Sequence, residues 1–131
     1  TAHALAQWLE REFPDDLRAV RYPFLPSHPQ YRLACEQMKA GGGIVCIVVR
    51  GGAQRAFRFV EALRWLSYTA NLGDARTTVT HPASTTHSKL TEAEREVAGI
   101  EPGLIRIAVG LEHLEDLQNE LRQALVASRN A

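Results

Sequence analysis

Residues 44–49 read Ile-Val-Cys-Ile-Val-Val, a run of six apolar residues that are mostly β-branched. Such a run is typical of a strand buried on both faces, so we expect it near the centre of a sheet. A second strand is predicted over residues 104–109, Leu-Ile-Arg-Ile-Ala-Val. Its alternation puts Ile105 and Ile107 on one face and Arg106 on the other.

Helical patterns separate and flank these strands. Apolar residues recur at helical spacing in five segments, and a further strand pattern covers residues 17–22. The expected helices are 1–12, 53–66, 91–98, 113–127, and one that begins at Ser27 or His28 and runs to Lys39. In the helix over 53–66, Arg55, Arg58 and Arg64 are expected to face solvent. Strands interleaved with helices predict an α/β chain, an α+β two-layer sandwich with a small mixed or antiparallel sheet and helices on one face.

The composition of the 131 residues fits one globular domain, with 45% hydrophobic and 23% charged residues. Fifteen basic and fifteen acidic residues give zero net charge, so we expect neither nucleic acid nor a membrane surface as a partner. No apolar run approaches the roughly 18 residues that a membrane span requires. Cys35 and Cys46 are expected to be buried thiols in a reducing, cytoplasmic setting rather than a disulfide.

Residues 71–87, Asn-Leu-Gly-Asp-Ala-Arg-Thr-Thr-Val-Thr-His-Pro-Ala-Ser-Thr-Thr-His, are dense in small polar side chains and predict a loop that bears a site. His81 and His87 lie six residues apart without a third ligand nearby, which is a poor metal pattern. Hydrogen bonding of the histidines to the loop backbone is the expected alternative. No nucleophile elbow surrounds Ser84. Asp74, which follows a glycine, is expected to form a turn.

Arg106 is the clearest candidate for a binding residue, because an arginine within an apolar strand must find acceptors for a rigid guanidinium. It could form an ion pair, extend to water, or grip the carboxylate of a ligand through two parallel hydrogen bonds. Lys39 and Lys89, the two lysines, lie in polar settings. Neither setting would lower the pKa of a lysine for imine chemistry.

Three blocks, 71–74, 81–87 and 103–112, together resemble the C-terminal domain of the Cys/Met-metabolism enzymes that use pyridoxal phosphate. Residues 25–30 and the glycine-rich entry to the strand at Ile44 agree with this resemblance. Many members of the family have serine where Asn71 stands and methionine where Thr85 stands. Within the family, the blocks look most like those of O-succinylhomoserine sulfhydrylases.

The resemblance implies a fold-type I enzyme whose large domain holds the cofactor. Residues 1–131 would then be the small C-terminal domain, entered part-way through a helix that leads in from a large domain missing from this sequence. Arg106 matches the arginine that binds the substrate α-carboxylate. Asn71 and Leu72 match the segment beside that carboxylate, and Thr86 matches a wall of the substrate site. The family's Schiff-base lysine has no match here, so no catalytic, cofactor-binding or metal residue is expected in this chain.

By the same resemblance, the full-length protein would be a homotetrameric pyridoxal-phosphate enzyme of methionine biosynthesis and transsulfuration. Its substrates would be a homoserine ester and sulfide, and its product homocysteine. The 131 residues alone are expected to bind no cofactor and to be inactive. Cystathionine γ-synthase, cystathionine γ-lyase and methionine γ-lyase activities remain open, as does a stand-alone, non-catalytic binding module.

Overall fold

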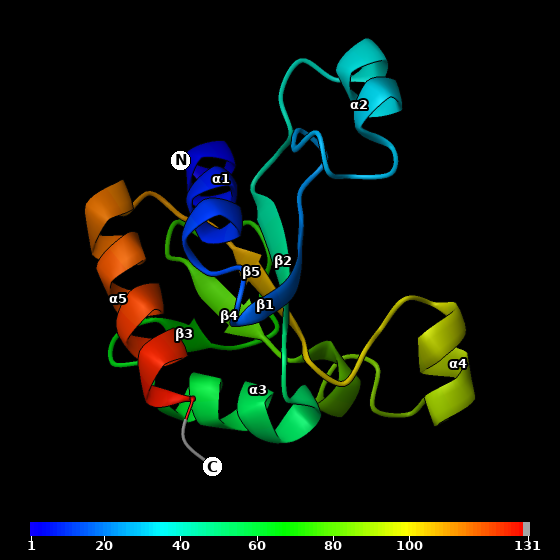
Figure 1. Cartoon of the computed structure of the whole chain (residues 1–131), viewed down its shortest axis with the longest axis vertical. Helices are drawn as coiled ribbons and strands as arrows, with labels where there is room; N and C mark the ends of the chain where they lie inside the picture. Colours follow the sequence, from blue (N-terminus) through cyan, green and yellow to red (C-terminus); the bar gives the residue numbers. More distant parts are fainter. Residues whose placement is uncertain (130–131) are drawn as a thin grey trace.

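Five strands pair in the order β1-β2-β5-β4-β3 in the computed structural model, which describes residues 1–129 (Figure 1). Each of the first three pairings is antiparallel and β3 pairs with β4 in parallel, which makes the sheet mixed. The segment over 44–49 lies between β1 and β5, inside the sheet as predicted. The strands are β1 Leu17–Arg21, β2 Ile44–Val49, β3 Ser67–Tyr68, β4 Thr78–Thr80 and β5 Leu104–Ala108.

Three helices form the second layer: α1 Ala2–Glu12, α3 Gly52–Glu61 and α5 Leu114–Ala127. They share one apolar core with the sheet, which includes Ile105 and Ile107 of β5, Phe59 of α3 and Leu121 of α5. Burial of alternate strand residues against helices on one face confirms the predicted two-layer sandwich. Among the described residues, no helix is both long enough and apolar enough to cross a membrane.

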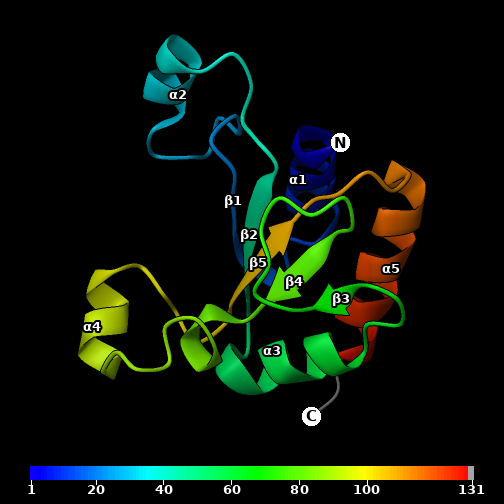
Figure 2. The ribbon, with the colours of Figure 1, turned by 180° about the vertical axis from the view of Figure 1, so that it is seen from behind.

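The remaining two α-helices, α2 Tyr31–Gln37 and α4 Glu92–Val97, stand away from this core in both views (Figures 1 and 2), and a 3-10 helix, η1 Pro82–Ser84, follows β4. Helix α2 is shorter than predicted, because residues 23–30 form successive turns, and of its residues only Ala34 is buried. Helix α4 has the predicted capping box, in which the side chains of Thr91 and Glu94 each bond the other's backbone N–H.

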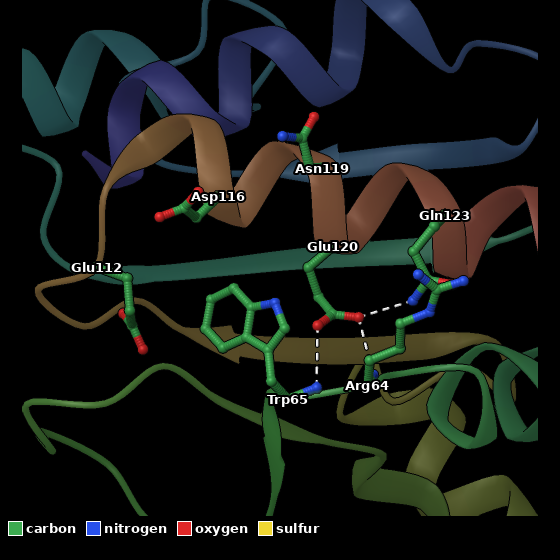
Figure 3. Close-up of a pocket in the computed structure, with 7 residues that line it drawn as sticks. All are labelled: Arg64, Trp65, Glu112, Asp116, Asn119, Glu120 and Gln123. Carbon is green, nitrogen blue, oxygen red and sulfur yellow. Dashed lines mark hydrogen bonds between the residues drawn. The ribbon is translucent and has the colours of Figure 1, made fainter.

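Helix α3 ends at Glu61, five residues before the predicted end at 66. The buried carboxylate of Glu120 on α5 explains the early end, because it accepts hydrogen bonds from the backbone N–H groups of Arg64 (2.9 Å) and Trp65 (3.0 Å) (Figure 3). A charged acceptor from a neighbouring helix thus replaces the carbonyls that a continuing helix would supply.

The expectation that both thiols are buried was wrong for Cys35 and is met only in part by Cys46. Cys35 is exposed on α2, which has little core to pack against, and Cys46 is half-buried in β2. Both thiols are free, as predicted. Burial raises the pKa of the Cys46 thiol, and the nearby Arg106 and Arg21 guanidiniums partly oppose that rise.

Asp16, immediately before β1, ties distant parts of the chain together. Its carboxylate is 4% exposed and accepts hydrogen bonds from Arg55 of α3 (2.5 Å) and from Arg129, which follows α5 (2.8 and 2.9 Å). Arg55 also donates to the hydroxyl of Ser128 (3.2 Å). The expectation that Arg55 faces solvent was therefore wrong, because a buried carboxylate 39 positions earlier draws it inward.

We predict that Asp16→Asn destabilises the protein by about 3 kcal/mol at neutral pH, because it leaves the buried Arg55 cation without a counter-charge. Hydrogen bonds from Arg129, together with Arg55, hold the pKa of Asp16 below its ordinary value of 3.8 despite burial. The ionised carboxylate therefore stabilises the fold above that value, and this stabilisation is lost as the pH falls through the lowered pKa.

Denaturant unfolding from about pH 7 down to about pH 2.5 would measure this effect, since the gap between wild type and Asp16→Asn should narrow with acid. Asp15→Asn, at an exposed neighbouring position, is the matched control and should change little. A deficit for Asp16→Asn that stays constant across the pH range would contradict the expected role of the charge.

Candidate functional site

Polar side chains form a row across the sheet face opposite the helical layer. Strand register pairs Arg21 of β1 with Cys46 of β2, Cys46 with Arg106 of β5, and Arg106 with Thr80 of β4. Residues directly opposite each other in neighbouring strands point to the same face. The predicted alternation of β5 therefore places Arg106 in the middle of this row.

Arg106 is half-buried and has only part of its hydrogen-bonding capacity in use. Its Nη2 donates to the carbonyl of Ala70 (3.0 Å) and, at longer range, to the hydroxyl of Thr80 (3.4 Å). Its Nε is buried and has no partner. No carboxylate within residues 1–129 forms an ion pair with Arg106, whereas Arg21 in the same row is paired with Glu101. The ion-pair interpretation is therefore not supported, and the Nε–H of Arg106 is a buried donor without an acceptor among the described residues.

The backbone beside Arg106 is fixed at three successive carbonyls. Thr80 donates its hydroxyl to the carbonyl of Thr69 (2.5 Å), Arg106 donates to that of Ala70, and Thr78 donates its hydroxyl to that of Asn71 (2.8 Å). The structure thereby brings the Asn71–Leu72 segment next to Arg106, two groups that the family resemblance placed in one site. Both side chains of that segment are exposed, Leu72 by 57%.

A second set of contacts fixes the rest of the loop. Glu112, after β5, accepts hydrogen bonds from the backbone N–H (2.7 Å) and the hydroxyl (2.6 Å) of Thr77. Burial acts to raise the pKa of Glu112, but these bonds outweigh it and hold the pKa below its usual range. Thr77 in turn accepts from the N–H of Gly110 (2.8 Å). The carboxylate of Asp74 accepts from the N–H of Arg76 (3.0 Å), which confirms the expected turn.

His81 forms hydrogen bonds within the fold, but its ring contacts a carbonyl outside the loop and a side chain rather than the loop backbone that was predicted. It is 1% exposed, and its Nε2 lies 2.6 Å from the carbonyl of Pro102. A carbonyl can only accept, so Nε2 donates to it, and Nδ1 lies 2.7 Å from the hydroxyl oxygen of Ser84. Within the described part of the chain, no group of three or more histidine, cysteine, aspartate or glutamate side chains could hold a metal ion.

Thr86 is exposed, and its hydroxyl lies 2.9 Å from Nδ1 of His87. The contacts of its side chain do not link it to Arg106, so its place in a substrate wall stays a prediction. A cavity of about 550 Å³ includes His81 and Phe57 in its wall, and one of about 490 Å³ lies between Trp65 and Glu120 (Figure 3). Neither cavity is lined by a predicted substrate-binding residue.

Sequence reasoning missed Thr78, Thr80 and Glu112. The two threonines could have been found, because the alternation Thr78-Val79-Thr80 sends Val79 into the core and both hydroxyls to the face of Arg106. Glu112 could not have been found in this way, because its partner Thr77 lies 35 positions away and no local sequence pattern indicates the contact.

The sequence model of the family described as "Cys/Met metabolism PLP-dependent enzyme" matches residues 1–126. The chain belongs to this family. Two relatives in the Cys/Met metabolism family show the range of its activities. An O-succinylhomoserine sulfhydrylase from Pseudomonas aeruginosa is 47% identical over 127 residues, and an L-methionine gamma-lyase from Pseudomonas putida is 43% identical over 127 residues. Each alignment covers 97% of this chain and 31% of the relative, so the chain spans about a third of these enzymes.

Solved structures of the family have the same fold. Yeast cystathionine gamma-lyase superposes with a TM-score of 0.92 at 32% identity, covering 98% of this chain and 33% of that one. Cystathionine gamma synthase from Xanthomonas oryzae, in complex with cystathionine, gives 0.89 at 35% identity, covering 97% and 32%. These neighbours confirm the mixed α/β fold expected from the resemblance to fold-type I enzymes.

We predict that Gly110→Ala loosens the loop over 71–77 and destabilises the protein by about 1–3 kcal/mol. A Cβ at Gly110 would lie 2.3 Å from the carbonyl oxygen of Ala75 and 2.6 Å from the backbone N of Thr77, so the backbone must move. Hydrogen exchange of residues 71–77 and denaturant unfolding would measure the two effects. Gly43→Ala is the matched control, because its Cβ would meet nothing closer than 3.8 Å. Equal behaviour of the two variants would disprove the close packing at Gly110.

Proposed function

We propose that residues 1–131 are the substrate-binding C-terminal domain of a pyridoxal-phosphate-dependent homoserine-ester sulfhydrylase. The observation that carries the proposal is the half-buried guanidinium of Arg106, which the Ala70 carbonyl holds at Nη2 and which has no carboxylate partner within residues 1–129. The 47% identity to an O-succinylhomoserine sulfhydrylase supports this activity within the family. The same proposal includes a large domain in the rest of the protein, a cytoplasmic location and assembly as a homotetramer.

Arg106 would bind the α-carboxylate of the amino-acid substrate. A guanidinium offers two parallel N–H groups that match the two oxygens of a carboxylate, so it fixes the orientation of the substrate as well as its position. The Ala70 carbonyl already holds Nη2 in place, which reduces the rotamer entropy lost on binding. Asn71 and Leu72 would lie beside the bound carboxylate, and Thr86 would contribute to the wall of the substrate site.

Pyridoxal phosphate, the cofactor of the family, acts as an electron sink for amino-acid substrates. The residues of this chain do not provide its attachment point, because both lysines, Lys39 and Lys89, are exposed. Neither has the desolvated surroundings that are typical of a lysine that forms an imine. We therefore place the cofactor in the remainder of the full-length protein, and we expect the 131 residues alone to be inactive.

In the proposed reaction, sulfide replaces the acyloxy group at Cγ of O-succinyl- or O-acetylhomoserine. A C–S bond forms, the C–O bond breaks, and the products are homocysteine and the free carboxylate. The contribution of this chain is to hold the amino-acid end of the substrate, so that the position of the reacting carbon is defined.

A second candidate is γ-elimination, as in methionine γ-lyase, or the synthesis or cleavage of cystathionine. It is favoured by the 43% identity to an L-methionine gamma-lyase and by the superposition on a cystathionine gamma synthase bound to cystathionine. A non-catalytic binding module is a further alternative, in which the same carboxylate site would bind an amino acid without converting it.

We predict that Arg106→Ala in the full-length protein raises KM for the amino-acid substrate roughly 10- to 100-fold, because the variant loses one or two hydrogen bonds between charged groups. Steady-state kinetics would measure it, with thermal unfolding to exclude a loss of fold. Arg32→Ala, on the exposed surface of α2, is the matched control and should leave KM unchanged. An unchanged KM for Arg106→Ala would refute the assignment.

Product analysis should separate the candidate activities. We expect the full-length protein to make homocysteine from O-succinyl- or O-acetylhomoserine when sulfide is present. Cystathionine formed with cysteine would instead indicate a synthase. Release of an α-keto acid, ammonia and methanethiol from methionine would indicate a γ-lyase, and absence of all products with intact amino-acid binding would indicate a binding module.

A further inference from the structure

Thr80 occupies a special position beside Arg106. It is the residue of β4 that pairs directly with Arg106 of β5, and it is only 2% exposed. Its hydroxyl lies between the guanidinium and the segment that precedes Asn71, at 3.4 Å from Nη2 of Arg106 and 2.5 Å from the carbonyl oxygen of Thr69. A single side-chain atom thus contacts both the candidate ligand-binding cation and the backbone next to it.

The direction of these two hydrogen bonds follows from their chemistry. The Thr69 carbonyl can only accept, so the one hydroxyl proton of Thr80 is donated to it. The oxygen of Thr80 is then left as an acceptor, which is what the guanidinium, a pure donor, requires. Arg106, Thr80 and Thr69 therefore form a chain of bonds with one polarity, and the Ala70 carbonyl holds the same Nη2 from the neighbouring position at 3.0 Å.

Both bonds engage Nη2 and leave Nε without a partner. These two bonds limit rotation of the guanidinium at the end of its long, flexible side chain. An unrestrained arginine side chain has substantial rotamer entropy, which would be lost on binding a ligand. We propose that Thr80 is a positioning residue that aims Arg106 at the substrate carboxylate. The proposal rests on the proposed function of Arg106, and it adds a residue that acts on the substrate only through that guanidinium.

A variant series in the full-length protein would test this role. Thr80→Val keeps the shape of the side chain and removes the hydroxyl, whereas Thr80→Ser keeps the hydroxyl. We expect Thr80→Val to raise KM for the amino-acid substrate about three- to tenfold with a smaller change in kcat, and Thr80→Ser to restore KM to within about twofold. Thr91→Val, which removes a hydroxyl bond from the α4 capping box, controls for a general loss of stability.

Two further measurements distinguish positioning from a structural role. Equilibrium binding should be compared for an unreactive amino-acid ligand and for the amine that lacks only its carboxylate. Thr80→Val should weaken binding of the amino acid and leave the amine unaffected. In an Arg106→Ala background, Thr80→Val should change KM by less than about twofold, because the group through which it acts has gone.

Equal weakening of both ligands, or failure of Thr80→Ser to recover KM, would overturn the positioning role. A large effect of Arg106→Ala with none of Thr80→Val would overturn this inference and leave the proposed function standing. No effect of Arg106→Ala would overturn both proposals.

Discussion

The pairing of β5 with neighbours on both sides is the constraint from which the core and the candidate site both follow. Because β2 and β4 fix its register, the period of two sends Ile105 and Ile107 into the helical layer and Arg106 to the opposite face. A slip of one residue would bury the guanidinium among the helices and expose the isoleucines. The apolar core therefore holds Arg106 in place, although no core residue touches a ligand.

Periodicity in the sequence predicted the features that depend on near neighbours along the chain. It found β2 and β5, which are two of the three inner strands, the helices at both ends and the face on which Arg106 lies, because burial on one side of an element leaves a local pattern. It failed where a charged group from a distant segment decides a local conformation. Glu120 ends α3 by taking the N–H groups of residues 64 and 65, and Asp16 draws Arg55 inward.

The candidate site likewise contains residues that the sequence predicted and contacts between distant segments that it did not. Arg106 could be selected from its strand alone, and the resemblance to a family supplied Asn71, Leu72 and Thr86. The structure adds the contacts that hold the first of these segments: hydroxyls of Thr78 and Thr80 on backbone carbonyls, and the carboxylate of Glu112 on Thr77. Loop carbonyls and N–H groups that bond to these side chains hold an irregular segment in place, as the hydrogen bonds of a sheet hold a strand. The irregular residues 69–77 can thereby present a fixed surface, whereas residues 78–80 of the predicted loop form β4.

The unused Nε of Arg106 has an energetic meaning. A buried donor without an acceptor lowers stability by about 1–3 kcal/mol, and folded proteins rarely retain one. Arg21, two strands away in the same row, shows the alternative, because Glu101 neutralises it. A carboxylate in the corresponding position beside Arg106 would stabilise the domain and at the same time compete with any carboxylate ligand. The absence of such a partner within residues 1–129 leaves the half-buried guanidinium without a counter-charge and held at one end, which strengthens its attraction for an incoming carboxylate. The stability given up at this position is thus the source of the affinity that the site would offer.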